Sequence, residues 1–355
     1  MDKFSVIITC VGSQLIVGMI EALKNQNDLP IKVIGTDANK NAIGRYFADS
    51  FYQVCNGSDP AYPEMMFGIA EKEKVRVIIP CSDEEAVSLS RARKMFEEHG
   101  IICAVDKIEI IQALADKYLM LKTLDEHGVS VPSYCSISSL QDLERVAETV
   151  SNSSEKFVLK PRVSRGARGV WIVGEYNRLK YLTASMDSER YYISYDEVYR
   201  TLKNIKRENF PSLLAMEYLP GDKFNVDILS INGKLLHILP RRRYFPIGSP
   251  TQACILEDNK EVINKCKEIL KVFNQSYLYD YELAIDINRN PMIFEINPRI
   301  NGTVAATIGC GVNIVIENVK LALGLPLSDL EVNYGVEMFR YWRELRLIDK
   351  NMIGK

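Results

Sequence analysis

The residues best suited to chemistry lie in two consecutive stretches of the chain, Tyr281–Ile287 (YELAIDI) and Phe294–Thr303 (FEINPRINGT). Both are rich in β-branched and aromatic residues, and the turn-forming Asn288–Pro291 (NRNP) separates them. This arrangement predicts a β-hairpin whose two strands carry acidic and amide side chains.

Alternation along the strands predicts which side chains meet. Glu282 and Asp286 share a face of the first strand, and Glu295 and Asn297 share a face of the second, with Phe294 on the opposite face. If the register joins the polar faces, Glu282, Glu295 and Asn297 converge, with Asp286 further along the row. Such oxygen donors suit Mg²⁺, which takes its other ligands from water and substrate phosphates. We predict a metal site rather than a hairpin with solvated acids, because unpaired buried charges are costly.

Several basic residues also lie in predicted strands or directly after them. Arg299 comes two residues after Asn297 and supplies a fixed cation next to the predicted metal. Lys160 ends a predicted strand, and the loop Arg162–Gly169 after it combines glycine, serine and arginine. Small and basic residues in a loop can close over phosphates. The cluster Arg241–Arg243 also follows an apolar strand, so we expect at least one of its arginines to bind an anionic ligand.

The length and composition of the chain limit the classes of protein to which it can belong. The chain has 355 residues, 47% hydrophobic and 25% charged, which predicts two or three globular domains. Its net charge of −2 and its lack of a long apolar run argue against nucleic-acid and membrane partners. The eight cysteines form no CxxC pair, the three histidines are scattered, and the first apolar run has no signal-peptide cleavage site. We expect a reduced, cytoplasmic protein without zinc or a nucleophilic cysteine.

The N-terminal third alternates strands and helices, which predicts a doubly wound parallel sheet with ligands at its strand ends. The predicted strands are 4–11, 31–37, 76–80 and 101–105, with helices over 14–25 and 83–99. A dehydrogenase is disfavoured because VGSQLIVG is not the glycine fingerprint, so Gly12 is expected in a turn and Asp37 at a strand end facing a cleft. Ser82–Glu85 is expected either to cap a helix or to contact substrate.

The rest of the chain predicts a mixed α and β structure. Helices are expected over 108–127, 178–210, 261–273 and 312–323, and strands over 157–160, 170–173, 213–219, 224–231, 234–239 and 336–343. The strands at 224–231 and 234–239 are predicted to form an antiparallel meander.

This order of parts resembles the ATP-grasp superfamily, in the branch of carbamoyl phosphate synthetase large-subunit domains, biotin carboxylase and pyrrolysine-pathway ligase-like proteins. The resemblance covers nearly the whole chain: a doubly wound domain, a small lid with its lysines, and the terminal ExNPR of Glu295–Arg299. It implies an N-terminal α/β domain at 1–115, a lid with a helical insertion at 116–212, and a C-terminal antiparallel-sheet subdomain at 213–355.

The resemblance also implies roles for individual residues. Arg299, Lys160 and Arg243 would act in catalysis. The magnesium ligands (or manganese ligands) would be Glu282, Glu295 and Asn297. The nucleotide contacts would be Lys117, Lys160, Ser164, Arg165, Gly166, Gly169, Glu217, Tyr218, Leu219 and Lys223. Glu217 would accept from the adenine amine and Leu219 would bond it through the backbone. Lys223 departs from the family, which often has a glutamate near the ribose at that position.

The implied activity is an ATP-dependent carboxylate–amine, or carboxylate–thiol, ligase that passes through an acyl phosphate and releases ADP. Its partners would be small-molecule carboxylates and amines, and a homodimer is a further expectation because dimers are common in the superfamily. Two alternatives stay open: carbamoyl phosphate synthesis with partner subunits, and an ATP-binding regulatory protein. Intact Glu295, Asn297 and Arg299 argue against the second alternative.

Overall fold

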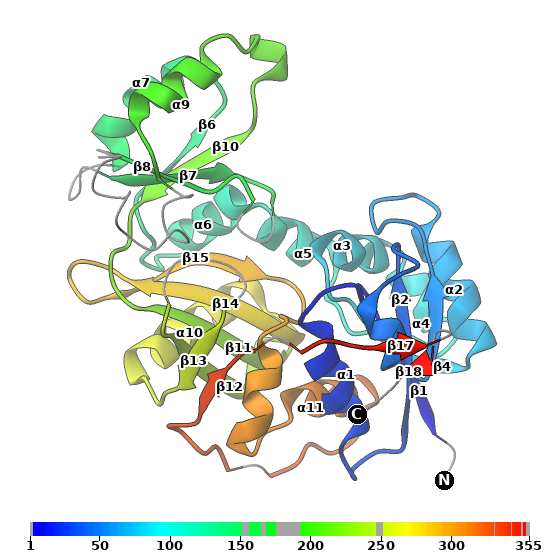
Figure 1. Ribbon diagram of the computed structural model, residues 1–355. Helices are drawn as coiled ribbons and strands as arrows, with labels where there is room; N and C mark the ends of the chain where they lie inside the picture. The colour runs from blue at the N-terminus through cyan, green and yellow to red at the C-terminus, as the bar shows by residue number, and fades with distance from the viewer. Residues whose placement is uncertain are drawn as a thin grey trace.

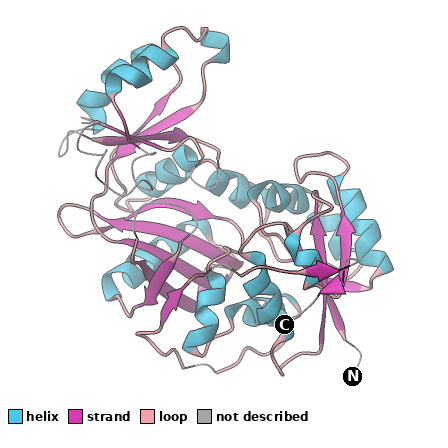
Figure 2. Cartoon of the chain, viewed as in Figure 1, coloured by secondary structure: helices cyan, strands magenta, loops and turns pink. Residues whose placement is uncertain are grey.

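The computed structural model describes residues 3–150, 156–164, 168–174, 192–245, 251–329, 331–341, 343–348 and 351–352. In these residues the chain forms a five-stranded parallel sheet, a five-stranded sheet in a projecting lid and a six-stranded antiparallel sheet (Figures 1 and 2). The mixed α/β class with a parallel N-terminal sheet and an antiparallel C-terminal sheet is the one the sequence predicts.

The N-terminal sheet has the strand order β3-β2-β1-β4-β5, and every neighbouring pair is parallel. Its elements are β1 (Phe4–Ile8), α1 (Ile16–Lys24), β2 (Ile31–Asp37), β3 (Ser50–Gln53), α2 (Tyr62–Lys72), β4 (Val75–Ile79), α3 (Asp83–Arg91), α4 (Arg93–Glu97) and β5 (Ile102–Cys103). The doubly wound prediction is confirmed. The single helix predicted over 83–99 is wrong, because the backbone at Ala92 leaves the helical region and divides it into α3 and α4.

Two helices connect this domain to the lid: α5 (Ile108–Ala115) and α6 (Lys117–Glu126). One continuous helix over 108–127 was predicted, but Asp116 adopts an extended conformation between them. The Asp116 carboxylate accepts the backbone N–H groups of Tyr118 and Leu119, and so caps the second helix. The break places Lys117 in the first turn of α6.

The lid sheet has the order β6-β10-β7-β8-β9. Its described elements are β6 (Tyr134–Ile137), α7 (Leu140–Val150), β7 (Phe157–Pro161), β8 (Trp171–Val173), β9 (Tyr192–Ile193), α9 (Tyr195–Leu202) and β10 (Leu213–Glu217). Of the helix predicted over 178–210, residues 178–191 lie outside the described residues, and α9 covers part of the remainder. Because β10 pairs with β6 and β7, we propose that the lid extends to residue 217.

The C-terminal sheet has the order β15-β14-β11-β12-β13-β16. Its elements are β11 (Lys223–Ile231), β12 (Lys234–Arg243), β13 (Ala253–Leu256), α10 (Lys260–Phe273), β14 (Tyr277–Ile285), β15 (Pro291–Asn297), the 3-10 helix η4 (Val304–Cys310), α11 (Ile314–Ala322) and β16 (Glu337–Phe339). The predicted hairpin, meander and helices are confirmed. The closing strand is shorter than the predicted 336–343, and a final short pair, β17 (Leu347–Ile348) and β18 (Asn351–Met352), follows it.

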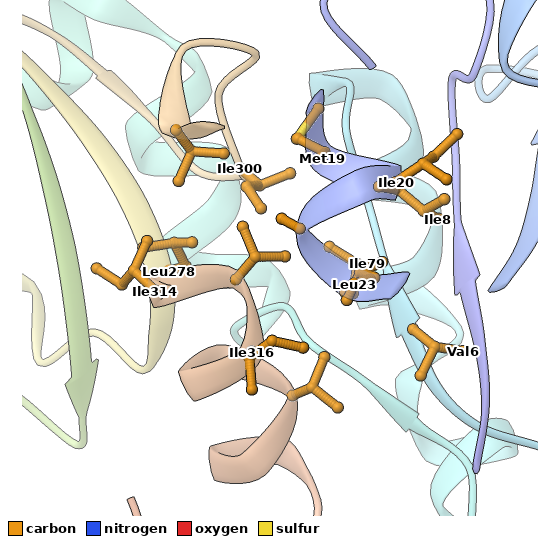
Figure 3. Packing of buried hydrophobic residues seen from close by; sticks show 14 of the residues in the cluster. Val6, Ile8, Met19, Ile20, Leu23, Ile79, Leu278, Ile300, Ile314 and Ile316 are labelled. Carbon is orange, nitrogen blue, oxygen red and sulfur yellow. The ribbon is translucent and has the colours of Figure 1, made fainter. Parts of the chain in front are cut away.

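Two apolar cores fix this sheet in place. One of its faces packs against α6 and α10, where β-strand residues such as Phe224, Tyr281 and Ile296 are buried. A second core joins the sheet and α11 to the N-terminal domain: in Figure 3, Met19 and Leu23 of α1 lie opposite Ile314 and other residues of the C-terminal half. This shared core sets the N-terminal strand ends relative to the antiparallel sheet.

Among the described residues, no single helix is long and apolar enough to cross a bilayer. Within the described part of the chain, η4 and α11 form the one pair of helices that is long and apolar enough when taken together, and they are bent by 106° at their junction. α11 is largely buried in the core shared with α1, and η4 contributes Val304 and Cys310 to the same core.

Candidate active site

The site is built on one face of the antiparallel sheet, where four neighbouring strands present polar side chains at alternate positions. β14 contributes Asp280 and Glu282, β15 contributes Glu295 and Asn297, β11 contributes Lys223, Asn225 and Asp227, and β12 contributes Arg241 and Arg243. The cross-strand partners include Glu282 with Glu295 and Asp280 with Asn297. The period of two therefore produces a continuous charged face opposite the apolar one.

The predicted orientation of Phe294 is wrong. The register shifts between Glu282 and Leu283, whose partners are Glu295 and Ile293, so β15 holds one additional residue at this point. This β-bulge turns Phe294 to the same side as Glu295, where it lines the cavity, while Ile293 stays in the core. The bulge adds an aromatic ring to the polar face.

Each acidic side chain of the predicted metal set has a basic partner. Arg243 Nη2 lies 2.5 Å from Glu282 Oε2, and Lys117 Nζ lies 3.3 Å from Glu295 Oε1. Burial alone would raise the pKa of Glu282, but the charge and hydrogen bond of Arg243 outweigh it and lower that pKa. For Glu295 burial dominates and raises the pKa, although Lys117 opposes the effect.

Asn297 is placed between these groups and a buried carboxylate. Its Nδ2 donates to Glu282 Oε1 at 3.1 Å and to Asp280 Oδ2 at 3.0 Å, and its Oδ1 accepts from Arg299 Nη2 at 3.0 Å. Burial, with the charges of Glu282 and Asp227, raises the pKa of Asp280 to about 7. The sequence reasoning missed Asp280, although its position two residues before Glu282 in a strand predicts the same face.

Two lysines border the same face. Lys160 Nζ donates to the Phe294 carbonyl at 3.0 Å, and both Lys160 and Lys223 approach the Phe294 ring. Burial lowers the pKa of Lys160 to about 8, with Lys117 adding to the effect. Burial also lowers the pKa of Lys223 to about 8, reinforced by Arg243. Two amines that have lost part of their hydration are suited to bind an anion, because the anion would stabilise their charged forms in place of water.

Arg299 connects this face to the N-terminal domain. Its Nε lies 3.0 Å from Asp83 Oδ1 in the first turn of α3, across 216 residues of sequence. Ser82 is the N-cap of α3 and accepts the Glu85 N–H at 3.4 Å. The two expectations for this segment were capping or substrate contact; the capping is confirmed, and Asp83 has the additional role of holding Arg299.

The phosphate-covering loop is described only in part. Arg165 and Gly166 lie outside the described residues. The Ser164 carbonyl accepts from Lys117 Nζ at 2.6 Å, which ties the start of the loop to the acidic face. Gly169 has a φ of +71°, and a Cβ there would lie 3.0 Å from Pro161 Cγ, so glycine is required at the turn.

A cavity of about 550 Å³ lies between the lid, the antiparallel sheet and the N-terminal strand ends. Tyr218 and Leu219 line it, together with Val158, Ile172 and Met216 of the lid. Among the described residues, Glu217 is not part of the lining: its carboxylate accepts the Ser133 N–H at 3.2 Å. An adenine contact by Glu217 stays a prediction.

The opposite end of the cavity has a different character. It is lined by neutral polar and aliphatic residues from both halves of the chain: Cys10, Ser13, Leu15, Ile16, Met19, Cys81, Ser82, Asn301, Gly302 and Thr303. Burial raises the pKa of the Cys81 thiol well above its usual value, so the thiol is neutral. Two of the charged side chains that line the cavity, those of Arg243 and Arg299, are each paired with a carboxylate.

Other basic and acidic candidates have structural roles. Of the arginine cluster, Arg243 faces the cavity, Arg242 pairs with Glu257 on the other side of β12, and Arg241 is buried against Asp227. Asp286 accepts the Asn290 N–H at 2.7 Å within the hairpin turn, outside the metal set.

Asp37 does not face a cleft as expected. It is buried and accepts the N–H groups of Gly12 and Asn39 at 2.6 and 2.7 Å, so it organises the loop after β1. The predicted turn at Gly12 is confirmed, because a Cβ there would lie 2.9 Å from the Asp37 carboxylate.

The donor set fits a hard divalent cation. No group of three or more His, Cys, Asp and Glu side chains suited to a metal occurs in the described part of the chain. Glu282, Glu295 and Asn297 instead offer two carboxylates and one amide oxygen, because the amide nitrogen of Asn297 is already used by two acids. Mg²⁺ accepts such a small protein set, since it keeps waters and takes phosphate oxygens.

Comparisons with known proteins agree with this architecture. Residues 209–341 match the family described as "ATP-grasp in the biosynthetic pathway with Ter operon", and residues 6–105 match the family described as "PylC-like, N-terminal domain". A search of curated protein sequences found no significant match.

Several solved structures share the fold. N5-carboxyaminoimidazole synthetase from Staphylococcus aureus, complexed with ADP, superposes with a TM-score of 0.68 at 17% identity, covering 93% of this chain and 81% of that one. The biotin carboxylase domain of 2-oxoglutarate carboxylase from Hydrogenobacter thermophilus gives 0.69 at 17% identity, with 95% and 74% covered. L-amino acid ligase from Bacillus licheniformis gives 0.63 at 14% identity, with 91% and 75% covered.

Proposed function

We propose that this chain, whose residues 209–341 match an ATP-grasp family, is an Mg²⁺- and ATP-dependent ATP-grasp ligase that activates a carboxylate as an acyl phosphate and joins it to an amine. One observation carries the proposal. Glu282, Glu295 and Asn297 meet Lys160 and Arg299 at a single cavity, and Lys117 pairs with Glu295, although these residues come from the lid, the connecting helix and the C-terminal half. Paired acids and cations on a desolvated face are suited to phosphoryl transfer.

The nucleotide would occupy the lid end of the cavity. Val158, Ile172, Met216 and Leu219 offer apolar surface for a base, and the two lysines with lowered pKa, Lys160 and Lys223, lie where the phosphates would follow. In this family-derived assignment Lys223 replaces a ribose-binding glutamate, so we expect it to bind phosphate oxygen instead. The magnesium ion, held by Glu282, Glu295 and Asn297, would neutralise the charge of the transferring phosphoryl group.

The proposed reaction has two steps. In the first, a carboxylate oxygen of the substrate attacks the γ-phosphorus, the bond to the β–γ bridging oxygen breaks, and ADP leaves. In the second, an amine nitrogen attacks the acyl carbon, the C–N bond forms, the bond to the phosphate oxygen breaks, and the amine loses a proton. Arg299, fixed by Asp83, is placed to stabilise the developing oxyanion, and the lid loop would exclude water from the mixed anhydride.

The neutral end of the cavity favours a particular class of carboxylate. Leu15, Ile16 and Met19 present aliphatic surface, and the polar groups beside them are hydroxyls, thiols and an amide. A phosphorylated or polyanionic substrate would need additional cations there, whereas the lining residues named for this end are neutral, and Arg243 and Arg299 of the same cavity are already paired with acids. We therefore expect the carboxylate to carry an uncharged, mainly aliphatic body.

The test is nucleotide hydrolysis with Mg²⁺, screened over pools of aliphatic, polar and polyanionic carboxylates with and without amines. Substrate-stimulated release of ADP, greatest with uncharged aliphatic carboxylates plus an amine, is the expected result. AMP would mean adenylation and would contradict the acyl phosphate. Stimulation by bicarbonate alone would support the carbamoyl phosphate alternative, and stimulation by a thiol in place of the amine would indicate C–S ligation.

A further inference from the structure

We propose that Asp280 is a positioning residue that orients the side-chain amide of Asn297, so that its oxygen rather than its NH₂ group faces the metal site. The inference rests on the proposed function in one respect only, the role of Asn297 as a metal ligand. Asp280 is fully buried beneath the polar face and touches no part of the cavity itself.

The hydrogen bonds define the orientation. Both N–H donors of Asn297 are directed at carboxylates, one at Asp280 Oδ2 (3.0 Å) and one at Glu282 Oε1 (3.1 Å). The reversed amide would place its oxygen against those two carboxylate oxygens and its NH₂ group against the Arg299 guanidinium, so that two acceptor–acceptor contacts and one donor–donor contact would replace the three hydrogen bonds. Asp280 Oδ2, which faces Asn297, also accepts from Asn225 Nδ2 at 3.1 Å, so Asp280 and Arg299 together favour this single orientation of the Asn297 amide.

The same carboxylate orients a second amide. Asn225 Nδ2 donates to Asp280 at 2.9 and 3.1 Å, which leaves Asn225 Oδ1 to accept Arg243 Nε at 2.6 Å. Arg243 in turn holds Glu282 at 2.5 Å. Asp280 therefore orients the Asn297 amide that would bind the metal. Through Asn225 it also positions Arg243, the cation that pairs with Glu282.

The chain contains a matched control. Asp227 is as buried as Asp280, and it pairs with the same guanidinium, Arg241, through two hydrogen bonds of 2.8 Å, whereas Asp280 lies 3.7 Å from that group. Among the described residues, the Asp227 carboxylate accepts hydrogen bonds from Arg241 and none from the amides of Asn225 or Asn297. Asp227→Asn therefore damages the buried ion pair at least as much as Asp280→Asn does, without changing the acceptor that faces Asn297.

The experiment measures Mg²⁺ affinity in the presence of saturating ADP by calorimetry, and Mn²⁺ affinity with ADP by electron paramagnetic resonance. Full-length wild type, Asp280→Asn and Asp227→Asn are compared below their melting temperatures. We expect Asp280→Asn to weaken metal affinity by about tenfold to a hundredfold, and Asp227→Asn to stay within about threefold of wild type. Equal losses in the two variants, or wild-type affinity in Asp280→Asn, would overturn the inference. A wild-type chain that binds no metal with ADP would overturn the proposed function as well.

An exchanged pair tests the same inference if Asp280→Asn does not fold. In the double variant Asp280→Asn with Asn297→Asp, the amide at position 280 can donate to the carboxylate at position 297 and still accept from Asn225. Asn297→Asp alone instead sets two carboxylates about 3.0 Å apart, as the native hydrogen bond measures. We expect the exchanged pair to bind Mn²⁺ with ADP more tightly than Asn297→Asp alone. Equal or weaker binding by the exchanged pair would contradict the orienting role.

Discussion

Nucleotide binding by this chain should depend on pH through two lysines, the buried Lys160 and the half-buried Lys223. Burial lowers the pKa values of Lys160 and Lys223 to about 8, and both amines lie on the cavity face that would receive nucleotide phosphates. A protonated lysine attracts the phosphates, so affinity is greatest below pH 8 and falls as the pH rises through that value. Binding in turn favours the charged amine, so nucleotide binding should take up protons.

The magnitude follows from the titration curve. With a pKa of about 8 the charged fraction of each lysine falls from about 0.9 at pH 7 to about 0.09 at pH 9, a loss of about tenfold per lysine. If both charged amines are required, ADP affinity without metal should fall by about a hundredfold between these values. Phosphate ionisation contributes little, because its second pKa is about 6.

The assay is calorimetric titration of ADP in EDTA from pH 7 to pH 9.5, with buffers of different ionisation enthalpy to count protons. Lys223→Met should reduce the affinity loss between pH 7 and pH 9 from about a hundredfold to about tenfold, because one titrating amine remains. A matched control is Lys234→Met, since Lys234 starts the neighbouring strand β12 on the exposed side of the molecule. An affinity that stays flat across this range, or a profile unchanged by Lys223→Met, would refute the reasoning.

Three further perturbations test other parts of the site. Gly302→Ala should destabilise the fold by about 1–3 kcal/mol, because its Cβ would lie 2.5 Å from Leu15 Cδ1 and 2.6 Å from Leu15 Cβ; in the double variant with Leu15→Ala, thermal unfolding should show only a partial recovery, because the Leu15 Cβ remains. Asp83→Asn should lower the turnover number more than it raises the Michaelis constant for ATP, because it releases Arg299 and leaves the lid end of the cavity unchanged. Glu282→Gln should abolish the increase in melting temperature that Mg²⁺ with ADP gives to the wild type, and a retained increase would remove Glu282 from the metal set.

Much of the fold follows from local patterns in the sequence. Strand and helix alternation in the first 105 residues predicts a doubly wound sheet, and two short runs separated by Asn288–Pro291 predict the hairpin that carries the acids. Period-two alternation also predicts that Glu282, Glu295 and Asn297 share a face. These features depend on neighbours within a few residues, so the sequence contains them directly.

Local patterns fail where the backbone departs from ideal geometry. The bulge in β15 rotates Phe294 onto the polar face, and the extended conformation of Asp116 divides a long apolar-periodic segment into two helices. In both places hydrophobic periodicity favours the regular alternative. The pairing of β15 with β14 and the capping by a side chain decide the outcome.

The sequence by itself determined the element order and the polar face of the hairpin, and it yielded the residues predicted to bind a metal and phosphates. Only the tertiary structure decided their partners. Arg299 meets Asp83 across 216 residues, and Lys160 meets the Phe294 carbonyl across 134. The tertiary structure also decided that Arg243 faces the cavity while Arg241 is buried, and that Asp280 lies beneath Asn297. The physical reason is that contacts between distant segments depend on sheet register and on the packing of α1 against α11, which no local pattern encodes.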